Sequence, residues 1–187
     1  MFVKPLRAII VMTILCGLIY PLAMTGLCQA LFPFQANGSI IERDGKVVGS
    51  AIIGQEFKGD KYFSGRPSAN EYNAADSAGT NYGAINKDLK KQVEERAAAV
   101  REKYGLLPTE KVPSDMVTND AAGFDPHLSP EAIHMQVNRV AQARNMDKSV
   151  VLKLVEQNTE YPSFGFIGEA RVNVLKLNLA LDKTQSQ

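Results

Sequence analysis

A long uncharged segment near the N-terminus constrains the fold more than any other feature of this sequence. Between Arg7 and Glu42 the chain contains no Lys, Arg, Asp or Glu, and residues 8–32 are almost entirely apolar. About 20 such residues in a helix are enough to cross a bilayer core of roughly 30 Å. The segment 8–32 is therefore predicted to form a single transmembrane helix.

The charges that flank this segment predict its orientation. Lys4 and Arg7 precede the apolar run, whereas residues 33–41 carry no positive charge. Because positively charged flanks are retained on the cytoplasmic side, residues 1–7 are predicted to be cytoplasmic. Residues 33–187 then form one external globular domain, which lies in the periplasm if the cell is a Gram-negative bacterium.

A cleaved signal peptide is the alternative interpretation of the apolar segment. Cys28-Gln29-Ala30 resembles a small-residue cleavage site that follows a positively charged start. The apolar core of a signal peptide usually has about 7 to 15 residues, and the run here is longer. Its length favours a retained membrane anchor.

Small side chains recur every four residues within the predicted span. Such a ridge lets helices approach closely in lipid, so we expect it to contact other transmembrane helices. The alternative is an anchor that touches no other helix, because Gly and Pro are also common in single spans. The ridge consists of Thr13, Gly17, Pro21 and Thr25.

Both cysteines of the chain, Cys16 and Cys28, also lie in this segment. Twelve residues of helix separate their Cα atoms by roughly 18 Å, and a disulfide requires less than about 7 Å. They are therefore not expected to pair, and the external domain must depend on its core for stability.

The first half of the external domain combines a hairpin, a long loop and a helix. Asp44-Gly45 favours a tight hairpin turn between residues 39–43 and 46–53. Residues 55–83 have no helical or strand period and are predicted to form a long ordered loop, which is uncommon unless it serves function. Asn86 is a predicted N-cap, and apolar residues at helical spacing follow it as far as Gly105.

The second half is predicted to contain two helices and a strand. Ser129-Pro130 is typical of a helix start, and this helix is expected to run to about Asn145. Asp147 is expected to cap a further helix. Leucines alternate from Leu175 to Leu181, which favours a C-terminal strand, although short leucine-rich segments can also be helical. The predicted class is α+β, with about three helices covering a small sheet made of the hairpin and the final strand.

The residues offer little catalytic chemistry. His127 and His134 are the only histidines, and the domain has no cysteine, so no metal site is predicted. Asp125, His127 and Ser129 are close in sequence, but helix capping explains them better than a hydrolase triad. No phosphate-binding glycine motif is present, and the balanced charge argues against nucleic-acid binding. No catalytic residue is expected.

A set of motifs spread over the whole chain resembles the KdpC family, the C subunits of Kdp potassium-transporting ATPases. These motifs are Gly49-Ser50, Ile53-Gly54-Gln55, Phe57, Tyr62-Phe63, Arg66-Pro67-Ser68-Ala69, Tyr72-Asn73, Asn81, Val117-Thr118, Asp125-Pro126-His127, Gln136, Arg139-Val140-Ala141, Ala143-Arg144 and Val172-Asn173-Val174-Leu175. Together they are highly specific.

The resemblance implies an accessory subunit of a high-affinity potassium uptake complex in the bacterial inner membrane. Its partners would be a channel-like potassium-binding subunit, a P-type ATPase subunit, a small peptide subunit and membrane lipid. The resemblance also implies support of the ATP affinity of the catalytic subunit. ATP would then act through the complex, with nucleotide contacts assigned to Thr118, Gly123, Asp125, His127, Ser129 and Gln136.

The sequence departs from the family pattern within this nucleotide signature. Where the family has Ser-Gly-Ser-Gly, the chain has Asp120-Ala121-Ala122-Gly123-Phe124, which loses two hydroxyl groups and adds a carboxylate. Phosphate oxygens would find fewer donors and a like charge there. An external domain would also meet little ATP.

Two mechanisms therefore stay open, nucleotide chaperoning through Gln136 and docking of the external domain over the potassium entrance. The residues favour docking, because aromatic side chains dominate interface energetics and an arginine can pair with a partner carboxylate. Internal packing of the same side chains is the alternative. The predicted contact residues of the loop are Tyr62, Phe63, Arg66 and Tyr72. A different class of function is an anchored external enzyme or binding protein that acts alone.

Overall fold

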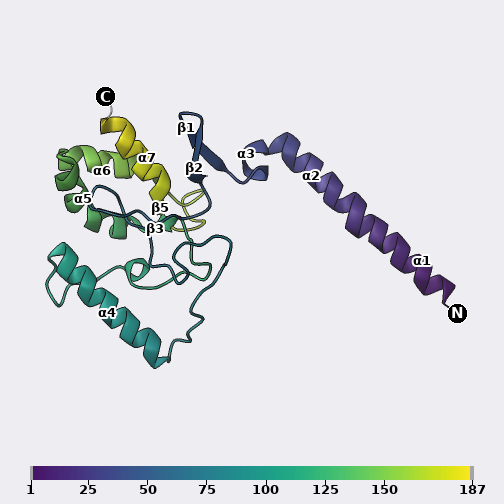
Figure 1. Cartoon of the computed structure of the whole chain (residues 1–187), viewed down its shortest axis with the longest axis horizontal. Helices are drawn as coiled ribbons and strands as arrows, with labels where there is room; N and C mark the ends of the chain where they lie inside the picture. The colour runs from purple at the N-terminus through teal and green to yellow at the C-terminus, as the bar shows by residue number, and fades with distance from the viewer. Residues whose placement is uncertain (1, 186–187) are drawn as a thin grey trace. The chain divides into compact units, whose positions relative to one another are not determined.

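The apolar N-terminal segment forms one continuous helix in the computed structural model of the chain, which describes residues 2–185 (Figure 1). The helix comprises α1 (Val3–Met12), the π-helical η1 (Thr13–Ile19) and α2 (Tyr20–Leu31). The π-helical turns directly precede Pro21, whose ring lacks an N–H group and displaces the carbonyl four residues earlier.

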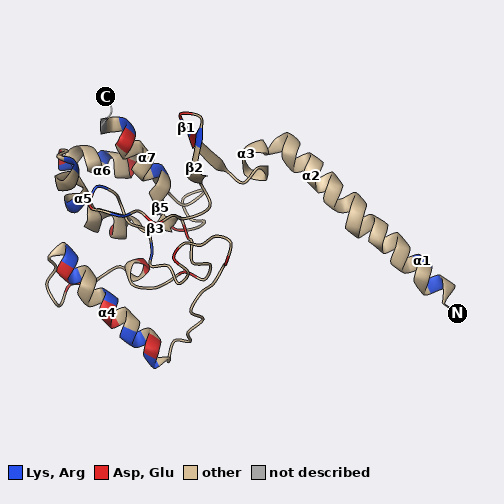
Figure 2. Cartoon of the chain, viewed as in Figure 1, with Lys and Arg blue, Asp and Glu red and all other residues tan. Residues whose placement is uncertain are grey.

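This helix has the length and the composition that a membrane span requires. The helix Val3–Leu31 contains an 18-residue window with a mean hydropathy of 2.2, and none of its residues is buried in the structure. Figure 2 shows the helix without charged residues beyond its N-terminal end. Cys16 and Cys28 are both free thiols in this helix.

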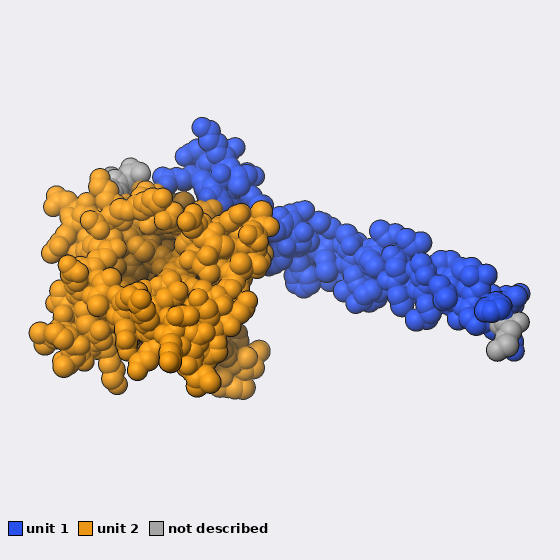
Figure 3. Space-filling model, turned by 60° about the horizontal axis from the view of Figure 1, so that its bottom comes forward, with its two compact units in different colours: residues 1–50 blue, residues 51–187 orange. Residues whose placement is uncertain are grey.

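The chain divides into two compact units, Met1–Ser50 and Ala51–Gln187 (Figure 3). In the first unit, the short α3 (Pro33–Ala36) follows the long helix, and β1 (Ile40–Arg43) pairs with β2 (Lys46–Ser50). Asp44 and Gly45 both have positive φ angles, as the predicted tight turn requires, so the hairpin is confirmed.

In the second unit, the three predicted helices form at the predicted positions. They are α4 (Lys87–Tyr104), α5 (Pro130–Arg144) and α6 (Lys148–Gln157). The side chains of Asn86, Ser129 and Asp147 cap their N-termini, as the sequence indicated. The single-turn η2 (Ser114–Met116) lies between α4 and α5.

The strand predicted from Leu175 to Leu181 is wrong, because these residues belong to α7 (Val174–Gln185). The side-chain oxygen of Asn173 accepts a hydrogen bond from the Lys176 N–H at 3.1 Å and starts the helix. Because every second residue is a leucine, leucines also recur four residues apart, and residues four apart lie on the same face of a helix. Leu177 and Leu181 are both fully buried on one helical face.

A three-stranded antiparallel sheet lies beside these helices, separate from the hairpin. β5 (Arg171–Asn173) is its central strand, between β3 (His127–Leu128) and β4 (Thr159–Glu160). The α+β class is confirmed, but the sheet is not a combination of the hairpin with a leucine strand. The core contains Phe63 and residues from α5, α6, α7, β3 and β5.

Candidate functional site

The predicted long loop is present, because no residue from Pro67 to Asn86 lies in a described helix or strand and the same is true of residues 51–66. We call residues 55–83 the long loop and residues 117–126 the short loop. The path of the long loop is fixed by its hydrogen bonds to the short loop, to α5 and to α7. These contacts define the candidate site.

Arg66 joins the long loop to the short loop. Its guanidinium donates to Asp125 Oδ2 at 3.1 Å, to Thr118 Oγ1 at 3.4 Å and to the Asn119 carbonyl at 3.5 Å. The Asp125 side chain also accepts the backbone N–H of His127 at 2.9 Å. One arginine thus holds three positions of a neighbouring segment.

These contacts set the charge state of Asp125. Burial alone would raise the pKa of the Asp125 carboxyl, but hydrogen bonds from His127 and Arg66 and the charge of Arg66 outweigh it. The pKa is therefore lower than its ordinary value of 3.8. Asp125 is ionised at neutral pH and paired within the chain.

Ser68 and Gly123 form a second connection between the loops. Ser68 Oγ donates to the Gly123 carbonyl at 2.6 Å and accepts the N–H of Tyr72 at 2.9 Å. Gly123 has a φ of 85°, and a Cβ atom there would collide with Asn70 Oδ1 and lie 2.9 Å from the Ala78 carbonyl. The position requires glycine for both conformation and space.

The Asp120 carboxylate fills a ring of backbone donors. Its Oδ2 accepts the N–H groups of Gly123, Phe124 and Asp125 at 2.9, 3.1 and 3.0 Å. Successive N–H groups of this kind form anion sites in phosphate-binding loops. Here the anion is a side chain of the same loop, so a phosphate would have to displace it.

Gln136 is fully buried in α5 and uses its amide group inside the protein. Its Oε1 accepts the Ser64 N–H at 2.9 Å, and its Nε2 donates to the Ser64 carbonyl at 3.1 Å. Arg139 donates to the same Oε1 at 2.9 Å. The side chain therefore connects α5 to the long loop.

Asn178 in α7 makes the equivalent pair of bonds to Phe63. Its Oδ1 accepts the Phe63 N–H at 2.9 Å, and its Nδ2 donates to the Phe63 carbonyl at 3.0 Å. Sequence reasoning missed this residue, because a strand assignment gave its side chain no particular role. A polar residue among helically spaced leucines was the available signal.

The positions assigned to nucleotide binding do not all line one hollow. Asp125, His127 and Ser129 line one hollow of about 460 Å³ together with Arg66, whereas Thr118, Gly123 and Gln136 are not among its lining residues. Ser129 Oγ accepts the Ala132 N–H and caps α5. Four carboxylates and two guanidinium groups, those of Arg66 and Arg171, line this hollow, so it has no excess of positive charge to attract phosphate groups. The acidic residues that line it are Asp115, Asp125, Glu131 and Glu169.

The loop residues assigned to partner contact have partners inside the domain. Phe63 is fully buried in the core. The ring of Tyr62 packs on the Arg144 guanidinium at 4.7 Å, and the Tyr72 hydroxyl donates to the Arg66 carbonyl. Burial, reinforced by nearby carboxylates, raises the pKa of Tyr72 to about 12, so this hydroxyl keeps its proton. Contact with another subunit stays a prediction for these residues.

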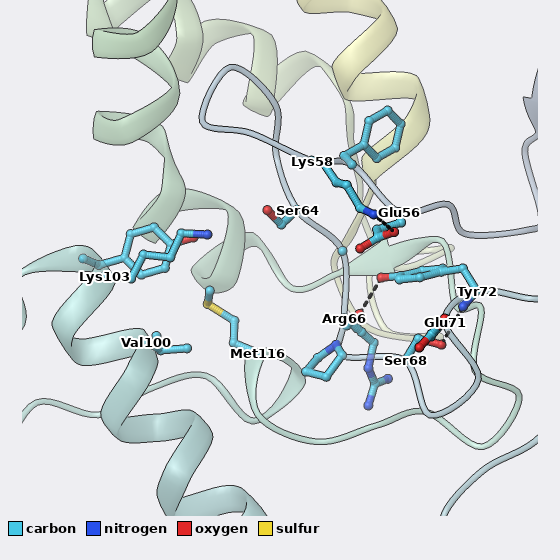
Figure 4. Close-up of a pocket in the computed structure, with 14 residues that line it drawn as sticks. Glu56, Lys58, Ser64, Arg66, Ser68, Glu71, Tyr72, Val100, Lys103 and Met116 are labelled. Carbon is cyan, nitrogen blue, oxygen red and sulfur yellow. Dashed lines mark hydrogen bonds and ion pairs between the residues drawn. The ribbon is translucent and has the colours of Figure 1, made fainter.

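A cleft of about 570 Å³ lies between the long loop and α4. Figure 4 shows Val100 and Lys103 of α4 on one side, Arg66 and Tyr72 on the other, and Met116 between them. The charged lining residues have mixed signs, which gives the cleft no preference for a polyanion. They are Glu56, Lys58, Arg66, Glu71 and Lys103.

The ridge of small residues in the N-terminal helix is exposed within its unit. Thr13 and Gly17 lie in η1, Pro21 and Thr25 lie in α2, and all four are exposed. Their contact with other helices stays a prediction.

Comparison with known proteins identifies the family. The family described as "KdpC: K+-transporting ATPase, c chain" matches residues 2–183, which include the apolar helix and nearly all of the second unit. The chain belongs to the KdpC family. Family membership makes it an accessory subunit of the Kdp potassium uptake complex.

Similar proteins cover almost the same length. A potassium-transporting ATPase KdpC subunit of Bradyrhizobium diazoefficiens is 49% identical over 193 residues, covering 96% of this chain and 94% of that protein. A KdpC subunit of Burkholderia cenocepacia is 51% identical over 188 residues, with 98% and 97% coverage. A third, from Rhodopseudomonas palustris, is 48% identical over 189 residues, with 94% and 92% coverage.

Replacing Gly123 with alanine should destabilise the connection between the loops. Gly123→Ala combines a left-handed backbone with a steric collision, and we expect a loss of at least about 2 kcal/mol in the free energy of unfolding. Denaturant unfolding of the detergent-solubilised chain measures this loss. Gly105→Ala is the matched control, because Gly105 also has a positive φ but has open space around it. Equal losses in the two variants would contradict the steric explanation.

The ion pair of Asp125 should make stability depend on acid pH. Because the folded pKa lies below the ordinary value of 3.8, the contribution is complete above about pH 4 and disappears as pH falls through the folded pKa. We expect Asp125→Asn to cost roughly 1 to 2 kcal/mol at pH 7. Unfolding curves from pH 7 to pH 2.5 should show this difference shrinking. A constant difference would contradict the assignment.

Proposed function

We propose that this chain supports the assembly of the potassium uptake complex and takes no part in the chemistry of ATP hydrolysis. The observation that carries the proposal is the bonding of Gln136, whose amide oxygen and nitrogen are both engaged with Ser64. A fully buried side chain with these partners stabilises the domain and has no free group for a nucleotide. Its role is to hold a rigid loop in place.

The bonding of the short loop supports the same proposal. Asp120 fills the three backbone donors that a phosphate would need, and Arg66 is already paired with Asp125. Ser129 serves as a helix cap, which leaves its hydroxyl without the geometry of an activated nucleophile. The chain is thus a non-catalytic subunit, and ATP acts on the complex through the P-type subunit.

The partners in this proposal are the channel-like potassium-binding subunit, the P-type ATPase subunit and the small peptide subunit. The apolar helix contacts lipid and, through its small-residue ridge, neighbouring helices. The external domain docks over the potassium entrance. Its long loop is suited to this, because internal hydrogen bonds fix the loop and little conformational entropy is lost when it binds.

The domain is proposed to lie in the periplasm, with the N-terminus in the cytoplasm. Lys4 and Arg7 lie at the N-terminal end of the helix, before its apolar residues, and no positive charge follows the helix before Arg43. An external location also separates the domain from the cytoplasmic pool of ATP, which agrees with a role in assembly.

Substitution of Gln136 distinguishes assembly from nucleotide chaperoning. Gln136→Ala leaves the Ser64 backbone groups unpaired, and we expect a cost of about 1 to 3 kcal/mol to the stability of this domain. Less of the chain should then co-purify with the other subunits in mild detergent. The apparent ATP affinity of the complexes that stay assembled should be unchanged. Asn138→Ala, at an exposed position of the same helix, is the control.

Two outcomes of this experiment would overturn the proposal. A weaker ATP affinity with intact assembly would favour nucleotide chaperoning by Gln136. Recovery of the wild-type chain alone from cells that make all Kdp subunits would instead favour an external enzyme or binding protein that acts independently.

Protease accessibility tests the proposed topology. Added protease should digest the domain in spheroplasts and leave a membrane-bound fragment of the N-terminal helix. In inside-out vesicles the domain should be protected. The opposite pattern would place the domain in the cytoplasm and remove the objection to contact with ATP.

A further inference from the structure

The segment between β4 and β5 exposes large apolar side chains in an otherwise well-packed domain. Residues 161–168, which we call the aromatic tip, contain no charged residue. Tyr161, Phe164, Phe166 and Ile167 are exposed by 67%, 87%, 78% and 54%. Monomeric proteins seldom leave so many adjacent apolar side chains in water, and such patches usually mark an interaction site.

The aromatic tip is an ordered structure. Ser163 and Ile167 exchange two backbone hydrogen bonds, at 2.9 and 3.0 Å, and the Gly165 N–H donates to the Pro162 carbonyl at 3.1 Å. Below the tip, Thr159 pairs with Val172, which is fully buried in the core. The exposed rings therefore stand on a fixed support.

The backbone of the tip is also strained at its most exposed residue. Phe164 has a φ of 55°, in a region that bulky side chains rarely adopt. Strain of this kind persists where the surrounding structure imposes it, and it is concentrated at functional positions. The backbone of the aromatic tip turns Phe164 outward rather than into the core.

The charges around the tip indicate what covers it. Glu160, at its base, forms ion pairs with both Arg171 at 3.1 Å and Lys176 at 3.2 Å. Glu169, at the other end, is exposed and forms no ion pair with any residue from 2 to 185. An aromatic centre with a charged rim is the usual composition of a protein interface.

We propose that the aromatic tip inserts into an apolar pocket of another subunit of the transport complex, with Glu169 facing a basic side chain at the rim of that pocket. This inference rests on the proposed assembly function and names the surface that performs it. Bare lipid is a poorer partner, because bacterial membranes carry anionic lipids and the two acidic and two basic side chains beside the tip balance, which leaves no net positive charge to attract them.

Removal of the two most exposed rings tests the proposal in the full complex. Phe164→Ser combined with Phe166→Ser should reduce the amount of partner subunits retained on the tagged chain at least tenfold, without changing the thermal unfolding of the chain itself. Ile85→Ser is the matched control, because Ile85 is 99% exposed at a different position of the same domain. This control should retain the partners fully.

The charge at the rim gives a second measurement. Glu169→Arg should lower retention several-fold at low ionic strength, and the difference should diminish as salt screens the charges. If wild-type chain retains its partners and the serine double variant retains them equally well, this inference fails while the assembly function stands. If even the wild-type chain retains no subunit, the assembly function itself fails.

Two probes at position 164 identify what the aromatic tip contacts. A photo-reactive benzoylphenylalanine placed there in the complete complex should cross-link to another subunit, and a cross-link to a second copy of this chain would overturn the proposal. Because the chain contains no tryptophan, Phe164→Trp gives a single fluorophore. The fluorescence can be measured in vesicles that contain the chain alone and brominated phosphatidylcholine. Quenching there would show that the tip contacts lipid and would overturn the proposal.

Discussion

Two buried amide side chains hold the backbone of two consecutive residues, and the rest of the domain depends on this arrangement. Asn178 bonds both polar groups of Phe63, and Gln136 bonds both polar groups of Ser64. A buried backbone group without a partner costs roughly 1 to 3 kcal/mol, so the four bonds permit an irregular segment to cross the core. They also bring the Phe63 ring into the core and fix where the long loop leaves it.

The same principle explains the chemical character of the candidate site. Arg66 and Ser68 face groups of the neighbouring loop, whereas Asp120 faces backbone groups of its own loop, and all these hydrogen bonds are made within the chain. Among the described residues, only Arg66 Nε and Asn119 Oδ1 of these two loops are buried without a hydrogen-bond partner, so most of the polar groups in the network are already engaged. Such a network suits a subunit whose surface must keep one shape against larger partners.

The local features of this fold could be predicted from the sequence, whereas the long-range ones could not. Asn86, Ser129 and Asp147 mark helix starts because a cap acts on residues only two or three positions away. The leucines from 175 to 181 satisfied two periods at once, and only the packing of Leu177 and Leu181 against the core decides for a helix. Charge and length alone predicted the apolar helix.

The candidate site was predicted as a set of residues but not as an arrangement. Motif resemblance singled out Arg66, Asp125 and Gln136, yet nothing in the sequence indicates that Arg66 pairs with Asp125 or that Gln136 faces Ser64. These partners are 59 and 72 residues apart. The roles of Asn178 and of the aromatic tip also depend on tertiary structure, because exposure and pairing have no local signature.

The bond between Phe63 and Asn178 spans 115 residues, and it has a consequence for how the protein is made. A ribosome delivers Phe63 long before Asn178, so the first part of the domain emerges without the helix that must receive it. The core closes only when synthesis is nearly finished. Until then the backbone of Phe63 lacks these partners, so the core is incomplete while most of the chain is being made.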